Sequence, residues 1–271
     1  MADPHGNRLV VDSLGKSFAL PGRQQGHRQV LAGVSFTAQP GEFVSVIGPS
    51  GCGKSTLFNT LAGLETPDSG RIRFGDETRP AAAHCAYMPQ KDLLFPWRTV
   101  LDNTILGLQV HGVAKAEARR RALELFDAFG LSGFEDARPS QLSGGMRQRA
   151  ALLRTVVQER ELLLLDEPFG ALDSLTRTEM QGWLQDVWQR YRWMVLMITH
   201  DIREAVYLSD RVVVLSTCPA TVRREVRVDL PRPRTLSMIT EPEFAASEQE
   251  LLDVLTAETP PPPGRISSRR S

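Results

Sequence analysis

The sequence predicts an α/β fold built around a phosphate-binding loop, and three observations support this. Apolar runs of strand length occur at residues 43–47, 162–165 and 194–199. Segments with the apolar spacing of helices lie between these runs. Residues 48–55, directly after the first run, read GPSGCGKS, and residues 56–62 continue with helical spacing. A strand, a G-x4-G-K-S loop and a helix in this order are typical of a P-loop nucleoside triphosphatase core.

The composition of the loop explains how it binds a nucleotide. Its glycines let successive N–H groups point inward, and the following helix adds positive potential at the same place. We expect Lys54 to reach the β- and γ-phosphates and the Ser55 hydroxyl to bind Mg²⁺. An accidental loop of this pattern would occur in roughly one chain in a hundred of this length. The expected phosphate-binding residues are Gly48, Pro49, Ser50, Gly51, Cys52, Gly53, Lys54, Ser55 and Thr56.

Charge and cysteine content exclude several classes of protein. The 271 residues include 32 basic and 32 acidic side chains, so no global field attracts nucleic acid. The three cysteines lack metal-binding spacing and predict reduced thiols. No apolar run approaches the roughly 18 residues of a membrane span. If the protein acts at a membrane, we expect another chain to supply the spans.

The other elements follow from the same periodicities. Strand-like segments around the loop predict a small antiparallel sheet beside the nucleotide core, at residues 9–14, 30–36 and 71–74. Further strands are expected at residues 86–90, 211–215 and 222–229, and helices at 115–129, 145–159, 177–191 and 204–208. The helices before residue 160 predict an inserted α-helical subdomain at about residues 91–160.

The predicted domain organisation is one nucleotide-binding domain, residues 1–230, followed by a C-terminal extension, residues 231–271. Within the extension, the proline- and arginine-rich residues 231–234 are interpreted as a linker and residues 243–255 as a modest helix. The proline run and the charged end, from residue 260, are expected to be disordered.

Polar side chains end three of the predicted core strands, at the edge where open α/β sheets bind ligands. Asp166 suits a contact to Mg²⁺, and Glu167 can polarise a water for attack on the γ-phosphate. His200 can hydrogen-bond the γ-phosphate, and Gln90 can offer its amide oxygen to Mg²⁺ or to the water. Taken singly, each is also consistent with an ordinary solvated strand end. The nearby phosphate loop favours the catalytic interpretation.

Residues 142–148, which read LSGGMRQ, form a second candidate anion site. The Ser143 hydroxyl and the N–H groups of Gly144 and Gly145 precede a predicted helix. Because the first loop already holds the phosphates of a nucleotide, this second site favours an arrangement in which two chains sandwich ATP. A serine-glycine helix cap without a ligand is the alternative.

These motifs together resemble the ATPase subunit of an ABC transporter; they lie at residues 48–55, 90, 142–148, 162–167, 171–173 and 200. The resemblance spans roughly residues 9–216 and implies ATP and Mg²⁺ as cofactors. It makes Asp166 the magnesium carboxylate, Glu167 the catalytic base and His200 the γ-phosphate contact. Residues 143–145 would contact ATP held by a second copy of the chain, and Asp173 would act across that dimer. Phe18 would lie on the adenine, although it also fits a core position of the small sheet.

One segment indicates the kind of transporter. Residues 90–100 are similar to the nitrate, sulfonate and taurine importer group, which often has a Leu-x-Pro-Trp string here. The resemblance implies a peripheral ATPase on the cytoplasmic face of the membrane, with separate permease subunits and a solute-binding protein. Phe95, Pro96 and Trp97 would contact the permease, or would form a locally packed aromatic core. The alternatives are an exporter or lipoprotein-extraction ATPase and, as a different class, a non-transport ABC protein acting on DNA or the ribosome.

Cys52 lies inside the phosphate loop and carries a separate expectation. A thiol at a helix N-terminus is expected to have a lowered pKa. Alkylation of Cys52 should then inactivate the ATPase, and bound ATP should slow the reaction.

Overall fold

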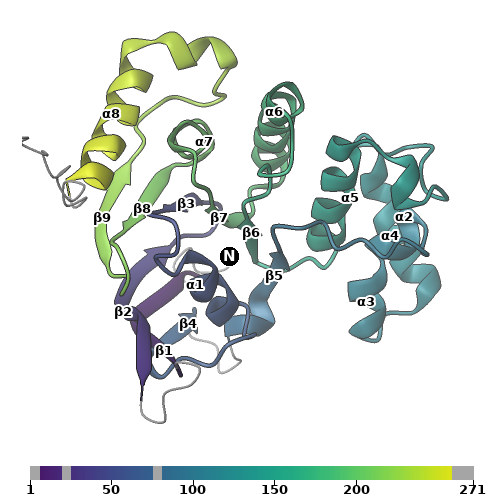
Figure 1. Ribbon diagram of the computed structural model, residues 1–271. Helices are drawn as coiled ribbons and strands as arrows, with labels where there is room; N and C mark the ends of the chain where they lie inside the picture. Colours follow the sequence, from purple (N-terminus) through teal and green to yellow (C-terminus); the bar gives the residue numbers. More distant parts are fainter. Residues whose placement is uncertain (1–6, 20–25, 76–80, 258–271) are drawn as a thin grey trace, which may run out of the picture.

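Two β-sheets organise the molecule. A computed structural model describes residues 7–19, 26–75 and 81–257 (Figure 1). The larger sheet has the order β5-β6-β7-β3-β8-β9. Its strands are β3 (Phe43–Ile47), β5 (Cys85–Met88), β6 (Leu162–Asp166), β7 (Met194–Ile198), β8 (Arg211–Leu215) and β9 (Val222–Arg227). All pair in parallel except β9, which joins β8 antiparallel. The predicted α/β class is confirmed.

The smaller sheet is antiparallel, as predicted, with the order β2-β1-β4. Its strands are β1 (Leu9–Ala19), β2 (His27–Ala38) and β4 (Ser69–Phe74), each longer than expected. The sheet packs with α1 (Lys54–Leu61) against one face of the larger sheet.

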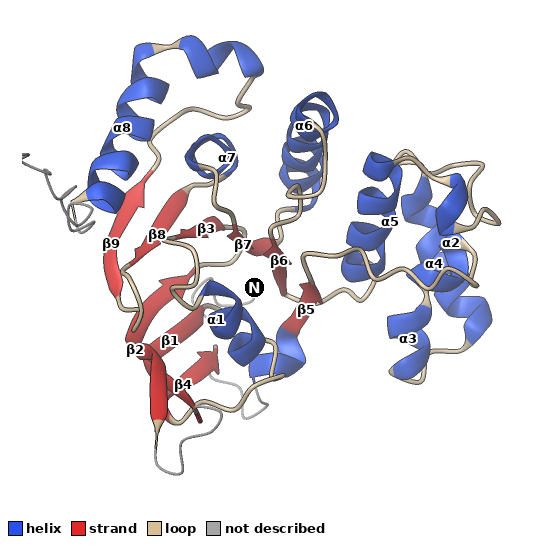
Figure 2. Cartoon of the chain, viewed as in Figure 1, coloured by secondary structure: helices blue, strands red, loops and turns tan. Residues whose placement is uncertain are grey.

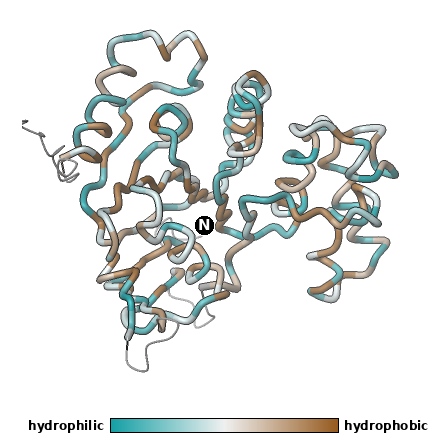
Figure 3. The backbone as a smooth tube through the Cα atoms, viewed as in Figure 1, coloured by the Kyte–Doolittle hydropathy of each residue, from teal (hydrophilic) through white to brown (hydrophobic). Residues whose placement is uncertain are grey.

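The central strands β3, β6 and β7 are apolar at almost every position because each face of their sheet packs against its own core. Leu162 and Leu164 point into the core shared with α1 and the small sheet. Leu163 and Leu165 point the opposite way, into a core shared with helices. Figure 3, in which the chain is coloured by residue hydropathy, shows hydrophobic residues concentrated in the region of β3, β6 and β7.

A group of helices lies to one side of the sheets, between β5 and β6 in the chain (Figure 2). It contains α2 (Val100–Thr104), α3 (Leu106–Val110), α4 (Lys115–Phe126) and α5 (Gly144–Val156). Ala118, Ala122 and Phe126 form the buried face of α4, as the spacing predicts. The helix ends at Phe126, three residues before the expected end, and a turn continues to Gly130, where φ is +61°. These helices lie within the predicted subdomain at residues 91–160.

The second half of the chain supplies helices to the other core. These are α6 (Ser174–Tyr191), α7 (Ile202–Leu208) and α8 (Pro242–Thr256). Helix α6 begins three residues before its expected start because the Asp173 side chain caps it. Nowhere in residues 7–19, 26–75 and 81–257 is there a helix with both the length and the hydrophobicity to cross a membrane.

The linker expected at residues 231–234 is wrong, because this segment packs against the domain. Arg234 is only 2% exposed and donates hydrogen bonds to backbone carbonyls around the end of α7. After a short 3-10 helix (Leu236–Thr240), α8 buries Phe244 and Leu251 in the same core as the central strands. The disorder expected from residue 260 onward lies outside the described residues.

Candidate nucleotide site

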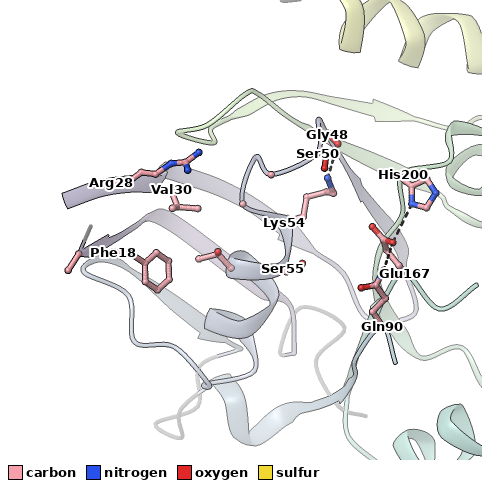
Figure 4. A pocket seen from close by; sticks show the side chains of 14 residues that line it. Phe18, Arg28, Val30, Gly48, Ser50, Lys54, Ser55, Gln90, Glu167 and His200 are labelled. Carbon is pink, nitrogen blue, oxygen red and sulfur yellow. Dashed lines mark hydrogen bonds and ion pairs between the residues drawn. The ribbon is translucent and has the colours of Figure 1, made fainter. Parts of the chain in front are cut away.

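A cavity of about 950 Å³ lies between the loop after β3, the small sheet and the ends of the central strands (Figure 4). Its lining contains many of the residues predicted from the sequence. The lining residues are Phe18, Ala19, Arg28, Val30, Gly48, Ser50, Gly51, Gly53, Lys54, Ser55, Thr56, Gln90, Glu167 and His200. Phe18 lies at one end of this cavity and His200 at the other (Figure 4).

The glycines of the loop are required by its backbone. Gly51 and Gly53 have φ values of +72° and +120°, which other residues rarely adopt. A Cβ at Gly53 would also lie 2.8 Å from a methyl group of Val30. The loop therefore closes tightly over the start of α1.

Lys54 is held inside this loop. Its side chain is 8% exposed, and Nζ donates to the carbonyls of Gly48 at 2.8 Å and Pro49 at 3.0 Å. Both partners are neutral, so phosphate oxygens would be stronger acceptors for this ammonium group. The arrangement can bind an anion by exchanging these two hydrogen bonds.

Asp166, the last residue of β6, is 6% exposed. Burial raises the pKa of this carboxyl, while hydrogen bonds from the hydroxyls of Tyr87 and Ser55 oppose the rise. Tyr87 Oη lies 3.2 Å from Asp166 Oδ2, and burial beside this carboxylate raises the pKa of Tyr87. Tyr87 was not predicted, because its proximity to Asp166 depends on the pairing of β5 with β6.

Three of the predicted strand-end residues meet at one point. Glu167 Oε2 accepts a hydrogen bond from Gln90 Nε2 at 2.9 Å and lies 3.4 Å from His200 Nδ1 (Figure 4). The backbone of Glu167 has φ +44° and donates its N–H to the carbonyl of Ile198 at 3.0 Å. Uncommon backbone conformations of this kind persist where the surrounding structure fixes them. The carboxylate is thus aimed into the cavity beside an amide and an imidazole.

The small sheet contributes the far end of the cavity. Phe18 is 37% exposed there, and Lys16 Nζ lies 5.2 Å from the centre of its ring. This exposure contradicts the alternative of a core position for Phe18. Arg28 and Val30 of β2 also line the cavity and were not predicted, because the polar stretch containing Arg28 has the composition of an ordinary hairpin.

The second anion motif does not reach this cavity within one chain. Ser143 caps α5, with its hydroxyl accepting from the N–H of Met146 at 3.2 Å. Neither Ser143 nor the following Gly144 and Gly145 line the cavity. Asp173 likewise caps α6, and hydrogen bonds from Thr176 lower the pKa of its carboxyl. Ser143, Gly145 and Asp173 thus lie outside the lining of this cavity, and Gly144 lines a neighbouring hollow that also contains Gln90.

The expectation of a lowered pKa for Cys52 is wrong. The thiol is 1% exposed, and burial raises its pKa against the opposing charge of Lys54. Its sulfur packs toward Gly48, where an added Cβ would lie 3.1 Å from it. The side chain packs in the core around α1 and β8, where the cost of burying a thiolate exceeds the stabilisation from the charge of Lys54 and from the backbone N–H groups at the start of α1.

We expect Cys52 to react with a maleimide at least about a hundredfold more slowly in the folded chain than in urea at about pH 7.5. The rate should rise with pH, because a thiol with a raised pKa forms its reactive thiolate only at higher pH. Peptide mass spectrometry after timed labelling measures this, with the half-buried Cys218 as the internal reference. Loss of ATPase before Cys218 is labelled would contradict the prediction.

The parallel sheet, the phosphate loop and the strand-end carboxylates define a P-loop nucleoside triphosphatase. Residues 31–170 match the family described as ABC transporter. The chain belongs to this family, as an ATP-binding and ATP-hydrolysing subunit, which confirms the resemblance seen in its motifs.

Relatives match over most of their length. The nitrate import ATP-binding protein of Synechocystis is 41% identical over 239 residues, covering 86% of this chain and 90% of the relative. The taurine import ATP-binding protein of Pseudomonas aeruginosa is 40% identical, with 91% and 95% covered. A bacterial ABC transporter cassette solved as a dimer has a TM-score of 0.68 at 28% identity, over 82% of this chain and 100% of the cassette. That cassette is also known in a post-hydrolysis state with ADP and phosphate.

Proposed function

We propose that this chain drives the import of a small solute of the nitrate, sulfonate or taurine type through separate membrane permease subunits. The observation that carries the proposal is its likeness, over most of the chain, to ATP-binding proteins named for nitrate and taurine import. A peripheral position on the cytoplasmic face of the membrane and a solute-binding protein in the complex belong to the same proposal.

In the proposed reaction, Glu167 orients and deprotonates the water that attacks the γ-phosphate. Gln90 and His200 hold this carboxylate from both sides, and His200 also contacts the γ-phosphate. Lys54 exchanges its loop carbonyls for phosphate oxygens, and Phe18 supports the adenine. The groups from the three strand ends thus act on the same phosphate.

The oxygen donors near the loop fit a bound Mg²⁺. In the described part of the chain, no three His, Cys, Asp or Glu side chains are grouped closely enough to hold a metal by themselves. We propose that Ser55, Asp166 and Gln90 hold Mg²⁺ together with the phosphates, since hard oxygen ligands and substrate suit this ion. The ion would neutralise charge that develops on the phosphates.

A second copy completes each site. We propose that Ser143, Gly144, Gly145 and Asp173 of one copy face the nucleotide held by residues 48–56 of the other. The separation of the two motifs within one chain, and the dimeric state of the similar cassette, support this arrangement.

The proposed permease contact is the aromatic cluster Phe95, Pro96 and Trp97. Phe95 is 37% and Trp97 67% exposed, and their ring centres lie 5.1 Å apart, which disfavours a local aromatic core. The fully buried Asn103 fixes the backbone below: Phe95 N–H donates to Asn103 Oδ1 at 2.7 Å, and Asn103 Nδ2 donates to the carbonyl of Phe95 at 3.1 Å. An exposed aromatic pair on a fixed backbone suits a protein interface.

We expect Trp97→Ala to reduce the amount of permease that copurifies with the tagged chain at least about tenfold, since buried aromatic anchors dominate interfaces. The measurement is affinity purification from the cell's own membranes, followed by mass spectrometry of multi-spanning proteins. Leu64→Ala is the matched control, because Leu64 follows α1 in the chain and is 65% exposed, close to the 67% of Trp97.

Two outcomes would count against the proposal. Recovery of ribosomal or DNA-bound partners in place of membrane proteins would favour the non-transport class. Equal recovery of membrane subunits with both variants would retain transport and reject the aromatic cluster as the contact.

A further inference from the structure

The C-terminal extension packs against α7, the helix that begins just after His200. Figure 1 shows α8 beside α7 at the outer edge of the molecule, and the two helices are in contact. The expected linker and modest helix therefore contact the helix that directly follows His200, a residue of the proposed reaction.

The far end of α7 is fastened by two arginines of the extension. Arg234 donates to the carbonyls of Val206 at 2.7 Å and Ser209 at 2.6 Å, and more weakly to Tyr207 at 3.3 Å. Arg232 donates to the carbonyl of Leu208 at 2.6 Å and pairs with Asp210 at 2.8 Å. The last carbonyls of a helix have no partner within it, so these guanidinium groups satisfy them.

Arg234 is buried, and no carboxylate of the described residues lies within ion-pair distance of its guanidinium group. Its remaining hydrogen bonds go to the carbonyls of Val228 at 3.2 Å and Leu230 at 3.4 Å, and burial lowers its pKa to about 10. A buried cation is costly unless its hydrogen bonds are satisfied. The hydrogen bonds to the carbonyls at the end of α7 therefore determine the position of Arg234 and of the neighbouring residues of the extension.

The near end of α7 is tied to α8. Arg203, in its first turn, donates to Glu248 of α8 at 3.1 Å. These two residues share a hollow of about 450 Å³ with His200. Asp201, next to His200, caps the helix by accepting from the N–H groups of Arg203 at 2.8 Å and Glu204 at 3.2 Å.

The buried side of the same turn is linked to the strand before His200. Glu204 is 5% exposed and accepts hydrogen bonds from Thr199 Oγ1 at 2.5 Å and Gln181 Nε2 at 2.9 Å. A shift of α7 along its axis would therefore move Thr199 and Asp201, the residues on either side of His200.

We propose that residues 231–256 clamp α7 at both ends, and that Arg234 and Glu248 are positioning residues that hold His200 against Glu167. The inference rests on the role given to His200 in the proposed function. Loosening either end of the clamp moves the imidazole away from the γ-phosphate and slows hydrolysis, while the nucleotide-binding end of the cavity stays intact.

The test is a double-mutant cycle on the ATPase of the full chain, with Arg234→Lys and Glu248→Gln each made alone and with His200→Ala. Lysine keeps the charge of Arg234 but cannot reach all of its carbonyls. We expect kcat to fall about fivefold for Arg234→Lys and about twofold for Glu248→Gln, with the KM for ATP changed less than about twofold. Glu250→Gln is the matched control, because Glu250 lies on the same helix but pairs with Arg224 of β9 at 2.9 Å.

In the His200→Ala background, both effects on kcat should shrink to less than about 1.5-fold, because variants that act through one residue are not additive. Equal reductions of kcat in the native and the His200→Ala chains would reject the proposal that the extension positions His200, and would leave the proposed reaction intact. A native kcat for His200→Ala alone would instead reject the role of His200, and the inference with it. If Arg234→Lys does not fold, Glu248→Gln decides the question.

Discussion

Replacing Glu167 by glutamine is expected to lower the kcat of ATP hydrolysis at least about a hundredfold, the usual contribution of a general base. Glutamine keeps the shape of the side chain and its hydrogen-bonding to His200 and Gln90. It cannot accept a proton from the attacking water. ATP should therefore still bind, and a nucleotide-bound dimer should accumulate, because the step that releases it is blocked.

Phosphate release measures the rate, and size-exclusion chromatography with ATP and Mg²⁺ measures the dimer. Glu124→Gln is the control, because Glu124 lies on the surface of α4 and pairs only with Arg120 among the described residues, at 2.6 Å. A Glu167→Gln chain that hydrolyses ATP within about threefold of the native rate removes this carboxylate from the role of base.

If two copies of the chain share each nucleotide site, two inactive variants with defects in different motifs should restore ATPase activity when mixed. Lys54→Met removes the cation of the phosphate loop, and Ser143→Asp places a negative charge where the second motif would face the nucleotide. Aspartate caps a helix as well as serine does, so α5 should keep its start. Each variant alone should lose nearly all ATPase activity, since both sites of its dimer carry the defect.

Mixing the two purified variants should restore activity. A mixed dimer has one site with both defects and one site with neither. Random pairing makes about half of the dimers mixed, so about a quarter of the native activity is expected if the sites work independently. The Lys54→Met chain mixed with a chain that carries both substitutions is the control, because every site of every dimer in that mixture keeps at least one defect. Absence of recovery in the first mixture would contradict the shared site.

The parts of the site that the sequence predicted are those set by local chemistry. Gly53 and Lys54 are dictated by a loop that must curl around phosphate, and Glu167 and His200 follow apolar runs whose ends meet at one edge of a parallel sheet. Sequence order alone was enough to place them together. The same holds for the α/β class, because the central strands are apolar on both faces.

The parts that the sequence did not predict depend on contacts between distant segments. Tyr87 reaches Asp166 only because β5 pairs with β6. Cys52 is buried by neighbouring elements that its local position at a helix start does not reveal. Arg234 has the sequence context of an exposed linker, and only the unpaired carbonyls at the end of α7 explain its burial.

The fixed backbone beneath Phe95 has a consequence for assembly. Because Asn103 already orders this turn, a membrane partner would meet a surface whose shape is set before contact. Little chain entropy would then be lost on docking, so a pair of aromatic rings could provide useful affinity from a small area. A contact of this kind between the ATPase subunit and a membrane partner can transmit force, and it can dissociate without unfolding any part of the ATPase subunit.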